Sequence, residues 1–340
     1  MSTQHREGNP FTAACPQSGR GGFLGCFRAG CVIFALSALI LSGCGRDPEP
    51  LRIALNAWPG YGPIYLAQDK GFFREAGVEV KLLEFGALAD ARRAFEDGKV
   101  DGMATTIVEV LMARDATQRD LRILRVVDFS SGADMIAARK DVRSMRDLRG
   151  KRVGVEIASL GIYVLARALE LEGMTLEDVN LVPKDQSSMC KALLDGNLEA
   201  VVTYPPDSSS VLGNPEFRAV FTSREIPGEI ADVIAMDAEV LKERPEQVAA
   251  FLAAIDRAHA YMRENPDDAY RIMAARVRLP VEAFSSVLRD EITMVSPLEQ
   301  AAYLGEGGKL RPILEAAAAS LRHVGVLSDR PGLTDSLTEP

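Results

Sequence analysis

One segment of the chain occurs twice, and this internal repeat constrains the fold more than any other feature. The run Ala94–Thr105 aligns without gaps with the run Ala192–Thr203, at a constant offset of 98 residues. In both copies a helical pattern ends in Asp-Gly, an apolar–acidic–small triplet starts a strand, and a Thr closes it. A glycine after a helix is a common left-handed cap, so one such match is a generic α/β turn. Two copies, each within a strand–helix–strand pattern, favour two similar lobes.

Short apolar strands alternate with amphipathic helices from residue 51 onwards, which predicts an α/β fold with largely parallel sheets. The predicted strands are Leu51–Leu55, Val78–Phe85, Val100–Ala104, Leu121–Asp128, Arg152–Glu156, Asn180–Val182 and Ala200–Thr203. The predicted helices are Pro63–Lys70, Asp90–Asp97, Ile107–Arg114, Leu160–Glu172 and, in a helical C-terminal third, Glu246–Asn265.

Two extended segments, Asp134–Ala138 and Asp232–Ala235, are suited to crossing between the lobes. We therefore predict a discontinuous first lobe, residues 51–133 and 234–330, and a second lobe, residues 134–233. A chain that leaves one lobe, builds another and returns has two crossovers, which make a hinge.

Composition excludes several classes of function. Hydrophobic residues make up 47% and charged residues 26% of the chain, which is typical of a globular protein. The net charge of −9 argues against nucleic acid as a partner. The three histidines are far apart in the sequence and Cys190 is alone after residue 44, so we expect no metal, no cofactor, no catalytic residue and no internal disulfide in the main body. We expect Cys190 to pack as a small apolar residue.

The N-terminal residues are typical of an export signal. The 13-residue run Ala29–Leu41 has no charge and follows Arg28, and it is short for a membrane span, which needs about 20 residues. The sequence Leu41-Ser42-Gly43-Cys44 resembles the lipobox of bacterial lipoproteins. This resemblance implies that residues 1–43 are a signal peptide that is removed, that the Cys44 thiol is acylated, and that residues 44–50 form a tether. The alternative is a plain secretory signal with an incidental cysteine.

A longer pattern follows the first predicted strand. The run Asn56–Phe73, NAWPGYGPIYLAQDKGFF, resembles the opening of solute-binding proteins of ABC transporters, in the SsuA-type nitrate/sulfonate/taurine group that is also described as NMT1/THI5-like. The resemblance continues in Phe95–Thr105, Leu148–Glu156, Asp195–Tyr204 and Arg244–Val248. It implies a type II periplasmic-binding-protein fold, in which two α/β lobes joined by a two-strand hinge close on a small molecule.

Ligands of open α/β sheets bind outside the carboxyl ends of the strands, so we predict ligand contacts from residues that follow strands. In the first lobe these are Asn56, Trp58, Tyr61, Thr105, Thr106 and Ser131. Trp58 is the only tryptophan, and its loop position suits it to stack on a flat or cationic ligand. The alternative is that the indole packs this loop onto its own lobe. Thr105 and Thr106 are also expected to cap the helix that follows them.

In the second lobe the predicted contacts are Glu156, Ser159, Asp185, Gln186 and Tyr204. Ser159 is expected to cap the helix that starts at Leu160. A buried carboxylate needs a donor, and Lys184 is the only cation at these strand ends. Glu156 and Asp185 therefore favour a neutral polar solute, or one with nitrogen donors, over a sulfonate. The alternative is that both carboxylates cap helices or meet surface cations. Glu229, in a Pro-Gly bend, is either a contact that closes the lobes or part of a surface loop.

These observations predict a monomeric lipoprotein, anchored in a membrane at Cys44 and facing the periplasm. It would capture a small organic solute, nitrogenous or sulfonate-type, by closure of its lobes and deliver it to an ABC permease. One alternative is a ligand-sensing lipoprotein that presents its closed form to a receptor. The other is a pyrimidine-forming enzyme, because the resemblance extends to NMT1/THI5 enzymes. Their histidine and cysteine-rich iron site have no counterpart in the matching stretch.

Overall fold

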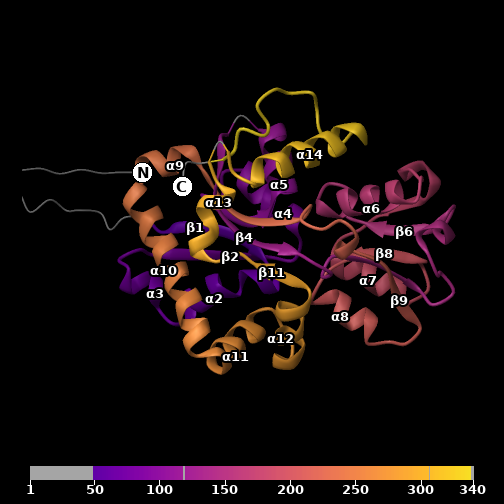
Figure 1. Ribbon diagram of the computed structural model, residues 1–340, viewed down its shortest axis with the longest axis horizontal. Coiled ribbons are helices and arrows are strands. Elements are labelled where there is room, and N and C mark those ends of the chain that lie inside the picture. The colour runs from indigo at the N-terminus through magenta and orange to yellow at the C-terminus, as the bar shows by residue number, and fades with distance from the viewer. Residues whose placement is uncertain (1–48, 118, 306, 338–340) are drawn as a thin grey trace, which may run out of the picture. The chain divides into compact units, whose positions relative to one another are not determined.

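The computed structural model describes residues 49–117, 119–305 and 307–337. The predicted signal peptide and Cys44 lie outside the described residues. The chain from residue 49 onwards builds two β-sheets with helices packed around them (Figure 1). We call the part around the six-stranded sheet the first lobe and the part around the five-stranded sheet the second lobe. The two-lobe α/β fold predicted from the sequence is confirmed.

The first sheet has the strand order β11-β4-β10-β3-β1-β2. Its strands are β1 (Leu51–Asn56), β2 (Val80–Phe85), β3 (Gly102–Thr106), β4 (Leu121–Ser130), β10 (Ala231–Asp237) and β11 (Ile292–Met294). β1 pairs in parallel with β2 and β3, whereas β10 runs antiparallel to both β3 and β4. The sheet is therefore mixed, and only its β2-β1-β3 part is parallel.

The second sheet repeats this arrangement, with the order β7-β6-β8-β5-β9. Its strands are β5 (Met135–Arg139), β6 (Arg152–Val155), β7 (Asn180–Pro183), β8 (Ala200–Thr203) and β9 (Phe217–Thr222). β6 is parallel to β7 and β8, and β5 is antiparallel to β8 and β9. Thus β5 and β10 occupy equivalent places in the two sheets.

The chain passes between the sheets just before these two strands. It leaves β4 and enters β5 through residues 131–134, and it returns to β10 through residues 226–230. The predicted crossing segments, Asp134–Ala138 and Asp232–Ala235, lie almost wholly in β5 and β10, so most of each segment belongs to a sheet and not to the connection. Their apolar residues are buried in the sheets, which explains this difference. The exact lobe boundaries predicted above stay a prediction.

Helices cover both sheets. In the first half of the chain they are α2 (Gly62–Asp69), α3 (Phe72–Glu75), α4 (Leu88–Glu96), α5 (Ile107–Ala116), α6 (Leu160–Leu171), α7 (Gln186–Leu194) and α8 (Asp207–Leu212). In the second half they are α9 (Ala238–Glu243), α10 (Pro245–Glu264), α11 (Pro266–Arg276), α12 (Val281–Asp290), α13 (Gln300–Tyr303) and α14 (Leu310–His323). α14 contacts both α5 of the first lobe and α6 of the second (Figure 1). Among the described residues, the structure contains no helix with the length and apolar character needed to cross a membrane.

The internal repeat corresponds to α4–β3 in the first lobe and α7–β8 in the second. Gly98 and Gly196 follow these helices with φ angles of 71° and 77°, which is the left-handed conformation that glycine adopts without strain. The repeat therefore predicts the same helix-to-strand turn in both lobes correctly.

Candidate functional site

A buried cavity lies where the two lobes meet, at the ends of strands from both sheets. It has a volume of about 10 Å³, which is room for about one water molecule. Its lining residues are Asn56, Trp58, Tyr61, Leu88, Thr106, Asp134, Leu160, Tyr204 and Asp232. Because Leu160 and Tyr204 belong to the second lobe and most of the others to the first, the cavity exists only while the lobes are together.

Trp58 contacts both lobes. Its ring meets that of Tyr204 across the interface, edge to face, with centroids 6.1 Å apart. Its indole Nε1 donates to the Asp128 carboxylate of β4 at 3.1 Å. Gly60 allows this contact, because a Cβ there would lie 1.8 Å from Oδ2 of Asp128. The indole therefore holds its loop on its own lobe, as the alternative interpretation expected, and its ring also contacts the other lobe; stacking on a ligand stays a prediction.

Hydrogen-bond acceptors predominate around the cavity. Asn56, at the end of β1, directs its Nδ2 to the hydroxyl of Tyr204 at 3.4 Å, while its Oδ1 is buried without a partner. Tyr61 donates its hydroxyl to Oδ1 of Asp232 at 2.5 Å. The donors of the site are therefore largely used within the protein, and at least one acceptor is free.

Asp134 and Asp232 line the cavity, and Asp128 lies against the indole N–H of Trp58; their exposed fractions are 3%, 2% and 0%. Burial, with a smaller contribution from the nearby carboxyl group of Glu109, raises the pKa of Asp134 to about 7. Burial also raises the pKa values of Asp128 and Asp232, each of which is affected by another buried carboxyl. The site thus holds carboxyl groups that resist ionisation.

Glu109, a fully buried residue of α5, links the two lobes directly. Its Oε1 accepts from the hydroxyl of Ser159 at 2.6 Å and from the backbone N–H of Leu160 at 2.8 Å. Its Oε2 accepts from the hydroxyl of Thr106 in its own lobe. The carboxylate of one lobe therefore caps the N-terminus of α6 in the other, where a negative charge is favourable. We call these bonds the Glu109 latch.

The model of one protein family matches residues 58–269, which is more than half of the chain. The chain belongs to the NMT1/THI5-like family. A putative binding protein of Brucella abortus is 29% identical over 240 residues, which cover 67% of this chain and 72% of that protein. The 4-amino-5-hydroxymethyl-2-methylpyrimidine phosphate synthase of Aspergillus parasiticus is 25% identical over 234 residues, covering 63% of this chain and 66% of the enzyme.

Solved structures of the same architecture exist. The alkanesulfonate-binding protein SsuA of Xanthomonas axonopodis, bound to MOPS, matches with a TM-score of 0.73 and 17% identity. The match covers 86% of this NMT1/THI5-like chain and 99% of that structure. This likeness shows a shared periplasmic-binding-protein fold.

The structure brings five of the eleven predicted ligand contacts to the cavity of this NMT1/THI5-like protein. They are Asn56, Trp58, Tyr61, Thr106 and Tyr204. Thr106 also caps α5, because its hydroxyl accepts from the N–H of Val108 at 3.2 Å. Thr105 does not cap the helix: it lies inside β3 with a buried, unpaired hydroxyl.

The other predicted contacts lie elsewhere. Ser159 stands at the cap position of α6, yet its hydroxyl donates to Glu109 and not to the helix, so that part of the capping prediction is wrong. Asp185 caps α7 through the N–H of Ser188 at 2.9 Å. Glu156 is buried near the end of β6, and burial raises its pKa to about 8.

The last two predicted contacts, and the bend residue, bind within the protein. Gln186 accepts from the hydroxyl of Thr203 at 3.0 Å inside the second lobe. Ser131 lies in the first crossover. Glu229 pairs with Arg167 of α6 at 2.8 Å, so it joins the second crossover to the second lobe. Whether these residues contact a ligand stays a prediction.

Asp134 and Asp232 line the cavity but were not among the predicted ligand contacts. The internal repeat could have identified both. Ala133-Asp134 and Ala231-Asp232 recur at the same offset of 98 residues as the rest of the repeat. Each pair stands at the start of an equivalent strand, β5 or β10. Extending the alignment to these segments would have placed one carboxyl group at the site from each copy.

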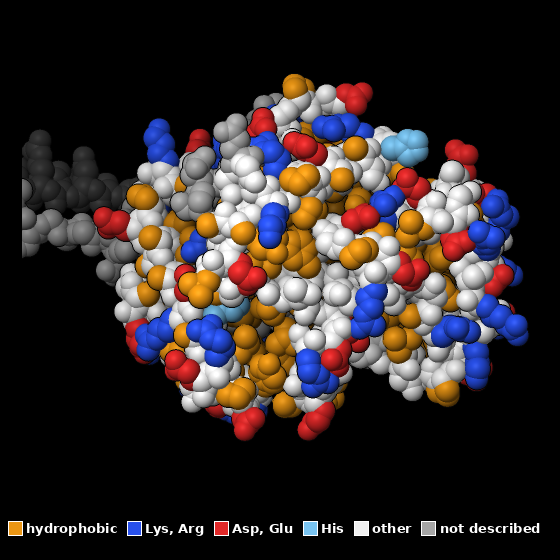
Figure 2. All heavy atoms as spheres, in the orientation of Figure 1, with side chains coloured by type: hydrophobic (Ala, Val, Ile, Leu, Met, Phe, Trp, Pro, Cys, Tyr) orange, Lys and Arg blue, Asp and Glu red, His pale blue; other side chains and the backbone are white. Residues whose placement is uncertain are grey.

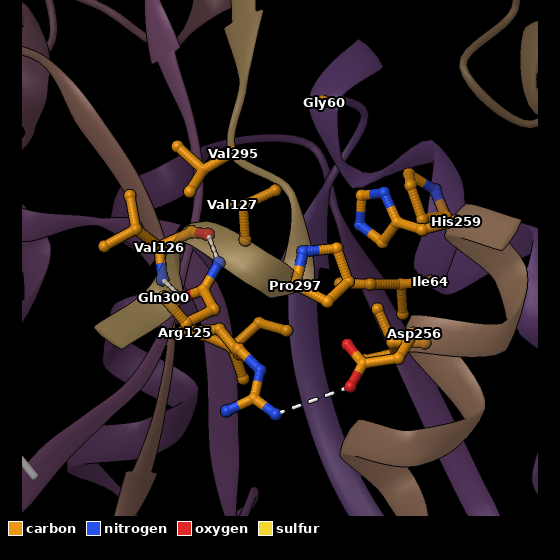
Figure 3. A pocket seen from close by; sticks show the side chains of 13 residues that line it. Gly60, Ile64, Arg125, Val126, Val127, Asp256, His259, Val295, Pro297 and Gln300 are labelled. Atoms are coloured by element: carbon orange, nitrogen blue, oxygen red, sulfur yellow. Dashed lines mark hydrogen bonds and ion pairs between the residues drawn. The ribbon is translucent and has the colours of Figure 1, made fainter. Parts of the chain in front are cut away.

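A second cavity lies within the first lobe, beside α10, and has a volume of about 20 Å³ (Figure 3). Arg125 faces Asp256 there at 3.6 Å, and Gln300 accepts from the N–H of Val126 at 2.9 Å. Burial lowers the pKa of His259 to about 4, so this side chain is neutral at pH 7. All lining residues belong to the first lobe, so occupancy of this cavity would not couple to closure.

Other chemistry is restricted in the described part of the chain. No group of three or more His, Cys, Asp or Glu side chains there is arranged to hold a metal ion. Cys190 is buried in the second lobe with its Sγ 3.3 Å from the hydroxyl of Thr203, and burial raises its pKa to about 11. A thiol with this pKa is a poor nucleophile at pH 7.

Proposed function

We propose that this chain is the extracytoplasmic solute-binding protein of an ATP-binding-cassette importer. It captures a small organic solute between its lobes and delivers it to a membrane permease. The observation that carries this proposal is the cavity to which both lobes contribute polar and aromatic side chains. A solute that contacts both lobes binds the closed form better than the open form, and this difference shifts the equilibrium towards closure.

Two comparisons support the proposal. The Brucella relative is named as a putative binding protein, and the Xanthomonas neighbour binds an alkanesulfonate. The lobes of the present structure touch through the Trp58–Tyr204 pair and through the Glu109 latch. Because the cavity between them has room for about one water, a solute must enter while the lobes are apart.

We propose that the protein is not an enzyme, although some relatives are named as pyrimidine phosphate synthases. The residues that line the cavity include neither a histidine nor a cysteine. His259 lines the separate cavity of the first lobe, and Cys190 is buried beside Thr203. The site therefore offers contacts for holding a solute, and no histidine or cysteine of its lining stands beside its carboxyl groups.

The finer parts of the sequence prediction belong to this proposal. We propose that the chain is a monomer anchored by a lipid on Cys44 and facing the periplasm. A sensor of the same architecture would present its closed form to a membrane receptor. Genes for a permease and an ATPase beside the coding gene favour transport, and a membrane sensor in their place would favour signalling.

Small-angle scattering tests the closure mechanism. The mature protein is measured first as purified and then after unfolding, dialysis and refolding, which removes any bound small molecule. We expect the emptied protein to have a larger radius of gyration, which returns to the smaller value when the released small molecules are added back. Mass spectrometry of the released fraction identifies the solute. An unchanged radius, together with no released small molecule, would contradict the proposal.

A further inference from the structure

We propose that the solute is an organic cation whose charged nitrogen carries N–H groups, such as an amidinium, a guanidinium or a primary ammonium. This inference rests on the proposed function and assigns the chemical class of its solute. It combines the carboxyl groups of the cleft, a free acceptor, an aromatic pair and the occupied N-terminus of α6.

The carboxyl groups of the cleft have no positive partner in the protein. Asp128 receives the indole N–H and Asp232 receives the hydroxyl of Tyr61, whereas Asp134 donates its backbone N–H to the hydroxyl of Ser130 at 3.1 Å. No described Lys or Arg pairs with any of these three aspartates, whereas other carboxylates oppose their ionisation. Burial makes these carboxyl groups resist ionisation until a positive charge pairs with one of them, so an enclosed cation would be stabilised there.

The acidity belongs to the cleft and not to the surface around it. On the face drawn in Figure 2, Lys and Arg side chains are interspersed with Asp and Glu. Surface carboxylates such as Asp90 and Asp195 are paired with a cation of the same helix or its end. Asp128, Asp134 and Asp232, in contrast, are buried beside the cavity without a cationic partner among the described residues.

A free acceptor points to hydrogen-bond donors on the solute. Asn56 is 2% exposed and lines the cavity, and its Oδ1 has no partner. An unmade hydrogen bond at a buried acceptor is costly. A solute with N–H groups supplies the missing bond, whereas a sulfonate or nitrate adds only further acceptors.

The walls of the cavity suit a cationic group. The rings of Trp58 and Tyr204 meet edge to face at 6.1 Å, one from each lobe. Aromatic faces attract cations, most strongly where water is excluded. If the lobes part enough to admit a flat cation, both rings remain within reach of it.

The Glu109 latch removes the feature that would attract an anion. A helix N-terminus is the usual anion site of such folds, because its free N–H groups and dipole favour negative charge. In this chain the N-terminus of α6 already holds the carboxylate of Glu109, which accepts from Leu160 at 2.8 Å. An anionic solute would have to displace this carboxylate and then approach three buried aspartates.

The single tryptophan makes the test direct. Because Trp58 is the only tryptophan and lines the cavity, emission excited at 295 nm reports on the cleft alone. The emptied protein is titrated with matched sets of small molecules: benzamidinium, benzamide and benzenesulfonate, and butylammonium, butanol and butanesulfonate. Trimethylphenylammonium separates positive charge from N–H donation. We expect saturable changes with the N–H cations, at least about 10-fold tighter than with their neutral and anionic counterparts.

Two matched variants separate binding from folding. In Asp134→Asn the shape of the side chain is kept and its charge is lost, so cation affinity should fall about 10- to 100-fold. Removal of an unpaired buried charge should leave the melting temperature of the empty protein unchanged or raise it. Asp147→Asn changes an exposed aspartate of the second lobe that accepts from the N–H of Ser144 at 3.0 Å, outside the cavity, and it should leave the cation affinity unchanged.

The outcomes of these titrations distinguish a wrong assignment of the solute's charge from a wrong proposed function. If a neutral or anionic member binds as tightly as its cation, or if Asp134→Asn leaves cation affinity unchanged, the assignment of charge is wrong and the solute-binding function stands. If no probe binds, the charge of the small molecule released on unfolding decides: a cation supports the inference and an anion overturns it. If no probe binds and nothing is released, the proposed function fails as well.

Discussion

Replacing Glu109 by Gln should weaken closure of the lobes without unfolding either of them. Two bonds of the latch cross between the lobes, from the Ser159 hydroxyl at 2.6 Å and from the Leu160 N–H at 2.8 Å. Hydrogen bonds to a charged group contribute about 1.5–3 kcal/mol each, and a charge at a helix N-terminus adds about 0.3–1 kcal/mol. The open form lacks these bonds, so the whole effect falls on closure.

The amide of Gln retains the shape and one acceptor oxygen, so only part of this stabilisation is lost. We expect a loss of about 2 kcal/mol, which is about a 30-fold lower ratio of closed to open protein. Solute affinity should fall by a similar factor when the closed form is a minor state of the empty protein, because binding must then also supply closure.

The assay combines solute affinity from Trp58 emission with the radius of gyration from scattering, each with and without solute. Asp147→Asn is the matched control, because Asp147 accepts a backbone N–H within one lobe, from Ser144 at 3.0 Å, and belongs to no predicted site. The control should lower the melting temperature slightly and leave affinity and radius unchanged. Equal affinities for Glu109→Gln and the native protein, with equal radii, would refute the latch.

Three further predictions follow from the same geometry. Gly60→Ala places a Cβ 1.8 Å from Oδ2 of Asp128, so the solute affinity measured by fluorescence should fall at least about 10-fold. Gly86→Ala adds a Cβ in open space and should leave the affinity unchanged. Burial raises the pKa of Asp134 to about 7 and that of Glu156 to about 8, so the empty protein binds more protons than the unfolded chain between pH 4 and 8. Its melting temperature should therefore fall as pH rises through this range, and cation affinity should rise; the opposite trend in thermal scans would contradict both. Gly154→Ala brings a Cβ within 2.7 Å of a leucine methyl in the second-lobe core and should cost about 1–3 kcal/mol in denaturant unfolding, and an unchanged midpoint would show that this core yields easily.

Local patterns were sufficient to predict the fold. Apolar runs bounded by turn residues gave the strands β1, β6, β7 and β8 to within about one residue, because their burial is visible in the sequence. The extended segments at Asp134 and Asp232 were found, but strand direction was not. β5 and β10 pair antiparallel with their neighbours, and this depends on which edge of a sheet the crossing chain reaches.

The site was predicted less completely, for a physical reason. Residues after strands were found when the strand itself was found, as with Asn56 and Tyr204. Asp128 and Glu109 were missed because each lies inside a regular element, and only tertiary packing shows that Asp128 meets the indole of Trp58 and that Glu109 meets the other lobe. Asp185 was chosen for its charge, and the structure shows that it caps α7; its contact with a ligand stays a prediction.

The position of α14 adds a third connection between the lobes, beside the two crossovers. This helix packs against both α5 and α6, so its contacts also resist separation of the lobes. When the lobes separate, α14 must lose its contacts with either α5 or α6 and move with the other helix. A chain truncated before Leu310 would lack these contacts, and its lobes would separate further even with both crossovers intact.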